Sequence, residues 1–198
     1  MAEDYGTLPA LKSRLGIEAS DTTQDEALNG ALGAASRGID RACGRRFWLD
    51  AQPVQRTYSP RGRVVRDSDG DRLLVDDIGS VTGMTVETGS GGTFAAVTGY
   101  ETSPDNALLD GQSITGLLLL NGSWGSGTGR VRVTARFGWP AVPAEISEAA
   151  LIQAARLYRR KSSPEGVTGS AEWGVVRLSR RDPDVWNLIE PYILPGFA

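Results

Sequence analysis

Residues 130–137 read Arg-Val-Arg-Val-Thr-Ala-Arg-Phe, an alternation of polar and apolar side chains. Successive side chains of a β-strand point to opposite faces, so this period of two predicts a strand with one buried and one solvated face. Shorter β-rich runs precede it, separated by clusters of Gly, Ser, Asp and Asn that favour turns; they cover residues 54–58, 72–75, 81–86 and 116–120. Residues 51–139 are therefore predicted to form an antiparallel β-module.

The segment before this module, residues 1–50, is predicted to be helical. Thr7 can cap a short first helix, and Gly16 is a natural stop for it. A second helix is predicted to start near Thr23, because Thr23 and Glu26 have the spacing of a capping box. The apolar residues that follow step by three and four, as one face of a helix requires; they are Leu28, Ala31, Leu32, Ala35, Ile39 and Ala42.

Three glycines and the only cysteine lie in or beside this second helix. Gly30, Gly33 and Gly38 together cost about 3 kcal/mol of helix propensity relative to alanine. A helix with this cost must be held by packing, so we expect something to approach its backbone closely. Cys43 falls next to the apolar stripe, and we predict a buried structural thiol.

Residues 140–198 return to helix. Pro143 can occupy the first turn of a third helix that runs to about Lys161 and presents one broad apolar face. Ile152 stands alone on the charged face of that helix. Asp182-Pro183 predicts the start of a short fourth helix. The predicted fold class is α+β, in which the N-terminal and C-terminal helices form one core and the antiparallel β-module is inserted between them.

The composition narrows the possible functions. The chain has 198 residues, no histidine, one cysteine and a net charge of −3. The absence of histidine removes the usual general base and the commonest zinc ligand, and a single cysteine cannot form an intrachain disulfide or a thiolate cluster. We therefore expect no enzyme, no cofactor and no metal site. No apolar run is long enough for a membrane span and no signal peptide is recognisable, so a cytoplasmic, membrane-free protein is expected.

The C-terminal segment is unusually apolar. Solvated chain ends are usually polar, because apolar surface in water is unfavourable by about 25 cal/mol per Å². Two interpretations stay open: the segment folds back on the core of its own subunit, or it docks on a neighbouring subunit or a partner, as aromatic anchors often do. The second interpretation assigns partner docking to Trp186, Ile189, Tyr192, Ile193, Leu194 and Phe197.

Several short motifs have simpler explanations than the sites they resemble. The glycine-rich run at residues 125–129 leads into a strand and not into a helix N-terminus, so a hairpin turn is favoured over a phosphate loop. The acidic run at residues 67–71 has its glycine in the wrong place for an EF-hand and lacks the distal glutamate. Asp76 and Asp77 are adjacent strand residues that point to opposite faces, which argues against a hydrolase built on this carboxylate pair.

A basic cluster marks the end of the third helix. It is compatible with complementation of the helix dipole or with phosphate contacts, and its residues are candidates for a DNA-channel surface. No helix-turn-helix or zinc finger accompanies it, so sequence-specific DNA recognition is not expected. The cluster consists of Arg156, Arg159, Arg160 and Lys161.

Several ordered segments together resemble the head-to-tail adaptors of tailed phages, the family of gp6-like and gp15-like connectors. Residues 35–47 are similar to the end of the family's second helix, with the pattern Ala-Ser-x-x-Ile-Asp-x-x-x-Gly-Arg-x-Phe. The matches continue in the expected order over nearly the whole chain, at residues 8–16, 74–81, 137–143, 163–166, 174–177 and 182–185.

This resemblance implies a structural protein of the virion neck, assembled in the host cytoplasm. Subunits of the family form a ring, expected to have about twelve copies, that joins the portal protein to the tail machinery around the DNA exit channel. Implied partners are the portal, a head-closure (stopper) or tail-completion protein, further copies of the chain, and genomic DNA through non-specific contacts. A head-to-tail contact between copies is assigned to Ile152, Trp173, Val175 and Val176. The alternatives are a head-closure or tail-completion protein of the same neck and a regulatory DNA-binding protein.

Overall fold

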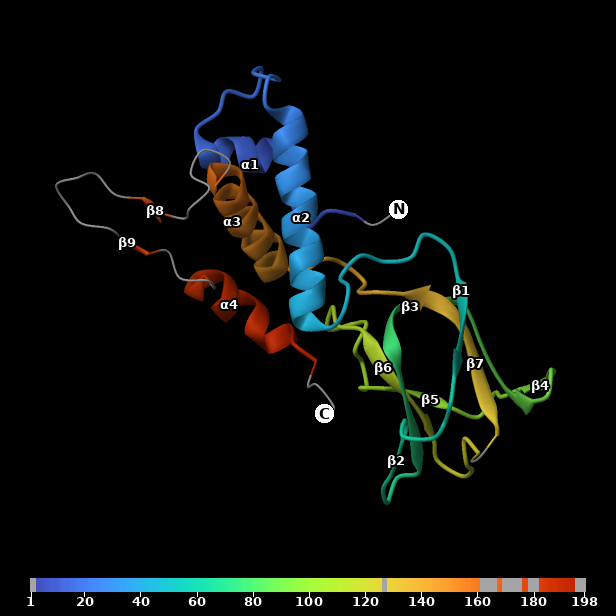
Figure 1. Cartoon of the computed structure of the whole chain (residues 1–198). Coiled ribbons are helices and arrows are strands. Elements are labelled where there is room, and N and C mark those ends of the chain that lie inside the picture. The colour runs from blue at the N-terminus through green and yellow to red at the C-terminus, as the bar shows by residue number, and fades with distance from the viewer. Residues whose placement is uncertain (1–2, 126–127, 161–166, 169–175, 178–181, 195–198) are drawn as a thin grey trace. The chain divides into compact units, whose positions relative to one another are not determined.

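The computed structural model describes residues 3–125, 128–160, 167–168, 176–177 and 182–194, with the side chains of 167–168 and 176–177 excepted (Figure 1). It divides into two compact units. One unit, here the helical unit, combines residues 1–46 with residues 142–198, and the other, here the β unit, covers residues 47–141. The helices and the antiparallel sheet confirm the predicted α+β fold class.

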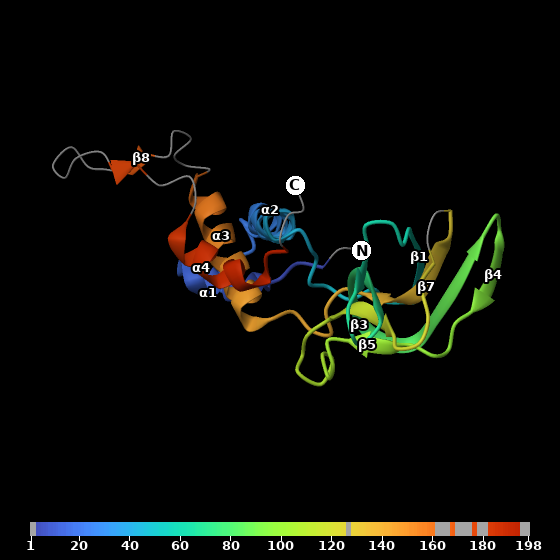
Figure 2. The ribbon, with the colours of Figure 1, turned by 90° about the horizontal axis from the view of Figure 1, so that it is seen from below.

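The helical unit is built on α1 (Leu8–Leu15), α2 (Asp25–Cys43), α3 (Ala144–Arg160) and α4 (Pro183–Ile189), followed by a 3₁₀ turn, η1 (Glu190–Tyr192). The helix α3 packs against α1, α2 and α4, and both views show it beside α2 (Figures 1 and 2). Two short strands, β8 (Val167–Thr168) and β9 (Val176–Arg177), pair antiparallel between α3 and α4. One cluster of buried side chains joins α1, α2 and α3: Leu11, Leu28, Ala31, Leu32, Ala35, Ala154 and Ala155.

The ends of α1 follow the sequence signals, whereas the start of α2 does not. The hydroxyl of Thr7 accepts a hydrogen bond from the amide of Ala10 at 3.3 Å, and Gly16 ends α1 with a φ of 70°. The predicted capping box at Thr23 is wrong, because α2 begins after Gln24 without a side-chain cap. The Thr23 hydroxyl donates instead to the carboxylate of Asp21 at 2.6 Å.

Among the described residues, nothing packs closely on the glycines of α2, so the close approach expected there is not made within the described part of the chain. A Cβ atom added at Gly30 or Gly38 would meet nothing within 4 Å. At Gly33 it would meet only the Asp4 carboxylate, at 3.6 Å. These three positions of α2 therefore have room for a larger side chain, and packing among the described residues does not explain why they are glycine.

The β unit is one seven-stranded antiparallel sheet. Its core path runs β1-β7-β3-β6-β5, and β2 and β4 pair additionally with β3. Figure 2 shows β4 running alongside the second half of β3. The strands are β1 (Val54–Tyr58), β2 (Val64–Arg66), β3 (Asp71–Ser90), β4 (Thr93–Ala96), β5 (Glu101–Ser103), β6 (Ile114–Leu119) and β7 (Arg130–Phe137).

The strand β3 corrects the prediction of two separate strands at residues 72–75 and 81–86. It is a single strand of 20 residues. Its register shifts between Leu74 and Ile78 and again between Ile78 and Thr85, so that its first half pairs with β6 and its second half with β7. Irregularities of this kind bend a strand and increase its twist. They allow β3 to change neighbours without ending.

The alternation in β7 is confirmed by its burial. Val131, Val133, Ala135 and Phe137 are fully buried. Trp124 is buried in the same core, and its indole Nε1 donates to the carbonyls of Asp71 at 2.9 Å and Leu117 at 3.0 Å. Tyrosine and tryptophan usually find such a partner when buried.

Two backbone segments cross closely where the chain enters and leaves the β unit. The amide of Asp50 donates to the carbonyl of Phe137, and the amide of Gly138 donates to the carbonyl of Asp77, both at 2.8 Å. Gly138 has a φ of 115°, and a Cβ atom at this position would lie 2.0 Å from the carbonyl oxygen of Trp48. Only glycine fits this crossing.

Candidate functional site

The C-terminal segment, as far as Leu194, packs on the helical unit. Asp182 caps α4 by accepting hydrogen bonds from the amides of Asp184 at 2.9 Å and Val185 at 3.3 Å. The amide of Leu194 donates to the carbonyl of Cys43 at 2.9 Å, which ties the segment to the end of α2. The first of the two interpretations, folding back on the subunit's own core, therefore describes this segment through Leu194.

The predicted docking residues differ in their exposure. Ile189 is only 3% exposed and belongs to the interior of its own unit, so it has no surface to offer a partner in this conformation. Trp186, Tyr192 and Ile193 are half-buried. Leu194 is 42% exposed, whereas Phe197 lies outside the described residues. In the described part of this segment, as far as residue 194, Leu194 is the large apolar side chain with the greatest exposure.

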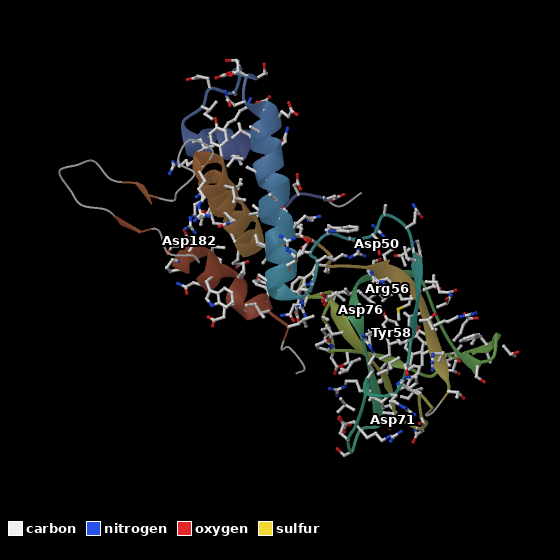
Figure 3. All side chains as sticks on the ribbon, viewed as in Figure 1. Asp50, Arg56, Tyr58, Asp71, Asp76 and Asp182 are labelled. Atoms are coloured by element: carbon white, nitrogen blue, oxygen red, sulfur yellow. The ribbon has the colours of Figure 1, made fainter. Side chains whose placement is uncertain are left out.

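The basic cluster of α3 is divided between a structural contact and an exposed end. A guanidinium nitrogen of Arg156 lies 3.0 Å from a carboxylate oxygen of Asp182, which is labelled in Figure 3. This ion pair links α3 to the start of α4. Arg159 and Arg160 are exposed in the last turn of α3, and Lys161 lies outside the described residues.

Cys43 is fully buried at the end of α2, which confirms the predicted buried thiol. Burial raises the pKa of this thiol from its ordinary value to about 11. The thiol form therefore dominates at neutral pH, and Cys43 cannot act as an accessible nucleophile in this conformation.

Lys12 forms a buried contact that the sequence pattern does not reveal. Its side-chain Nζ lies 2.6 Å from a carboxylate oxygen of Asp25 and donates to the backbone carbonyls of Asp21 at 2.8 Å and Ala19 at 3.3 Å. Lys12 is 4% exposed. The ammonium group therefore holds the connection between α1 and α2. The one feature of the sequence that could have drawn attention to Lys12 is that lysine is rare here, since almost all the basic residues are arginine.

Asp76 joins three parts of the β unit (Figure 3). It accepts from a guanidinium nitrogen of Arg56 at 2.7 Å and from the hydroxyl of Tyr58 at 3.2 Å, and Arg63 lies 3.8 Å away. Burial raises the pKa of the Tyr58 phenol well above its ordinary value, and the charge of Asp76 adds to this rise. The phenol stays protonated and serves as a hydrogen-bond donor.

Asp67, Asp71 and Asp77 of the β unit each have a separate local partner and do not form one site with Asp76. The carboxylate of Asp77 accepts from the hydroxyl of Ser113 at 2.6 Å, apart from the contacts of Asp76. Asp71 pairs with Arg66 at 3.0 Å, and Asp67 accepts from the amide of Asp69 at 2.9 Å within the turn between β2 and β3. Among the described residues, no group of three His, Cys, Asp or Glu side chains could hold a metal ion.

Comparison with known proteins identifies the fold. No protein-family model and no curated protein matches the chain. A protein in the neck of an empty gene transfer agent (GTA) particle, determined with C6 symmetry, matches with a TM-score of 0.56 and 18% identity. A protein in the virion of the native GTA particle matches with a TM-score of 0.54 and 18% identity. Each match covers 100% of this chain and 97% of the other. The chain has the fold of a GTA neck protein.

Of the residues assigned to contacts between copies, only Ile152 and the backbone of Val176 belong to the described part of the chain. Ile152 is half-buried on α3. Trp173 and Val175 lie outside the described residues, and only the backbone of Val176 is described, in β9. No helix in the described part of the chain has the length and apolar character that a membrane span needs.

Proposed function

We propose that this protein is a structural head-to-tail adaptor of a tailed phage or phage-like particle, a ring subunit that joins the portal to the tail machinery. The observation that carries the proposal is the match to a GTA neck protein over both units and the whole chain. The ordered segments of adaptor-like sequence are an independent support, because they do not depend on the structure. The role requires interfaces and no catalytic group.

The decisive experiment removes the gene from the phage or GTA genome that encodes it and examines the particles by electron microscopy. We expect separate heads and free tails, with joined particles restored when the wild-type gene is supplied in trans. Loss of DNA from the heads in addition would favour an adaptor or a head-closure protein over a tail-completion protein. Normally joined particles in the deletion strain would refute every neck role.

The exposed end of the C-terminal segment is proposed as the contact with the portal. Leu194 places an apolar side chain in solvent beside the end of α2, while its backbone amide is anchored on Cys43. An anchored segment with an exposed apolar side chain requires little ordering on binding, which favours affinity. Arg159 and Arg160, exposed at the end of α3, are proposed to face the DNA channel.

Leu194→Glu is expected to weaken binding to purified portal rings at least tenfold, because a buried unpaired carboxylate strongly disfavours an apolar contact. The measurement is co-sedimentation of the adaptor with the portal. Leu109→Glu is a matched control, because Leu109 is 85% exposed and lies in the β unit. Equal binding by the Leu194 variant and wild type would remove this segment from the portal contact and leave the neck role untouched.

A further inference from the structure

The arginines of the β unit differ in what holds their guanidinium groups. Those near β2 and the first half of β3 face carboxylates. Arg56 and Arg63 contact Asp76. Arg66 pairs with Asp71 at 3.0 Å, and Arg72 approaches Asp67 at 3.7 Å. Their positive charges are largely compensated within the unit.

Three arginines of β7 are held by neutral groups instead. A guanidinium nitrogen of Arg130 donates to the carbonyls of Thr128 at 3.2 Å and Gly129 at 2.8 Å. The guanidinium carbon of Arg132 lies 3.5 Å from the centre of the Phe94 ring, and Nε of Arg136 donates to the carbonyl of Asp50 at 2.7 Å. Within the described part of the chain, none of the three lies within 4 Å of a carboxylate.

These three side chains share the face of the sheet opposite the buried valines of β7. The register places Gln55 and Thr57 of β1 and Thr85 of β3 beside them on that face. Glu87 lies directly opposite Arg132, and Asp50 is a second acidic residue beside the face, through the carbonyl that accepts from Arg136. This β7 arginine face therefore has three arginines, with hydroxyl and amide side chains and these two acidic residues around them.

Neutral partners fix the position of a guanidinium group without reducing its charge. A group that is already positioned loses less side-chain entropy on binding, and the planar fork of arginine suits the paired oxygens of a phosphate. Hydroxyl and amide side chains supply further donors to phosphate oxygens. Such a face can bind a phosphate backbone without reading its bases.

We propose that the β7 arginine face binds the backbone of duplex DNA independently of sequence. The choice of duplex DNA among polyanions rests on the proposed neck function, because the proposed ring would surround the channel through which the DNA leaves the head. The face belongs to the β unit, whereas the exposed end of α3 belongs to the helical unit.

The test measures binding of the full-length protein to a mixed-sequence DNA duplex by fluorescence anisotropy over about 50 to 200 mM salt. Each phosphate contact contributes about 0.9 to the slope of log affinity against log salt. The triple variant Arg130→Gln, Arg132→Gln, Arg136→Gln is expected to reduce that slope by about 2 to 3. Glu87→Gln is expected to strengthen binding, because it removes the opposing charge.

The matched control removes three positive charges that face carboxylates in the same unit, through Arg63→Gln, Arg66→Gln and Arg72→Gln. It is expected to keep the slope of the wild type, and melting curves establish that each variant is folded. Equal losses in the two triple variants, or none in the β7 variant, would overturn the assignment. So would competition by poly-glutamate as effective as that by unlabelled DNA, which would indicate an acidic protein partner.

The deletion strain separates this inference from the proposed function. Joined particles formed with a β7 variant that does not bind DNA would be consistent with a neck role that does not require this face for joining. Conversely, normally joined particles in the deletion strain would refute the neck role even if the wild-type protein binds DNA. The reason for choosing DNA would then be lost, and the binding would stand on the anisotropy measurement alone.

Discussion

Gly138→Ala is expected to destabilise the β unit by about 3 to 5 kcal/mol. Two effects add at this position. The φ of 115° is a conformation that residues with a Cβ atom rarely adopt, and the new Cβ would lie 2.0 Å from the carbonyl oxygen of Trp48 and 2.8 Å from its carbonyl carbon. The backbone crossing would have to open, and the hydrogen bond from Gly138 to the carbonyl of Asp77 would be strained with it.

Urea denaturation followed by tryptophan fluorescence measures this loss. Gly62→Ala is the matched control, because Gly62 has a φ of 75° in the same unit but a Cβ there would meet nothing within 4 Å. The control isolates conformational strain and is expected to cost about 1 kcal/mol. If the two variants lose the same stability, the clash between a Cβ atom at position 138 and the carbonyl of Trp48 does not contribute to the loss.

Lys12→Met is expected to destabilise the helical unit by about 3 kcal/mol. The substitution keeps the apolar length of the side chain and removes the ammonium group. The Asp25 carboxylate and the carbonyls of Ala19 and Asp21 then lose their shared partner in a largely buried position. A buried polar group left without a partner is unfavourable by the cost of its desolvation.

Arg14→Met provides the comparison for Lys12→Met, again by chemical denaturation. Arg14 pairs with Glu148 at 2.5 Å, but both side chains are well exposed, so its loss is expected to cost less than about 1 kcal/mol. Comparable losses in the two variants would mean that burial does not strengthen the contact of Lys12.

Local signals predicted those elements whose ends depend on neighbouring residues. The cap at Thr7, the stop at Gly16 and the cap at Asp182 act within one turn of the chain, and the structure confirms them. The strand β7 was recognisable because its alternation is complete over eight residues. The start of α2 was misplaced because Asp21 competes for the hydroxyl of Thr23, and one side-chain pair then decides between two capping patterns.

Features that depend on distant partners could not be predicted. The continuity of β3 requires β6 and β7, which follow later in the chain and cover its two halves. The contact of Arg156 with Asp182 spans 26 positions, and nothing in the basic cluster distinguished this arginine from Arg159. The C-terminal segment posed the same difficulty, because an apolar composition does not show whether a side chain packs on its own core or on a partner. Only the structure shows that Ile189 is buried and Leu194 is exposed.

The long strand β3 has a consequence for how the β unit forms and varies. Both halves of the sheet include it, so neither half has a complete set of neighbours without the other, and the unit is expected to fold as one cooperative block. A residue inserted within β3 would shift one half out of register with the other and turn its buried side chains toward solvent. We therefore expect changes of length to be tolerated at hairpin tips such as Gly91–Gly92, where added residues leave the β3–β4 pairing in place.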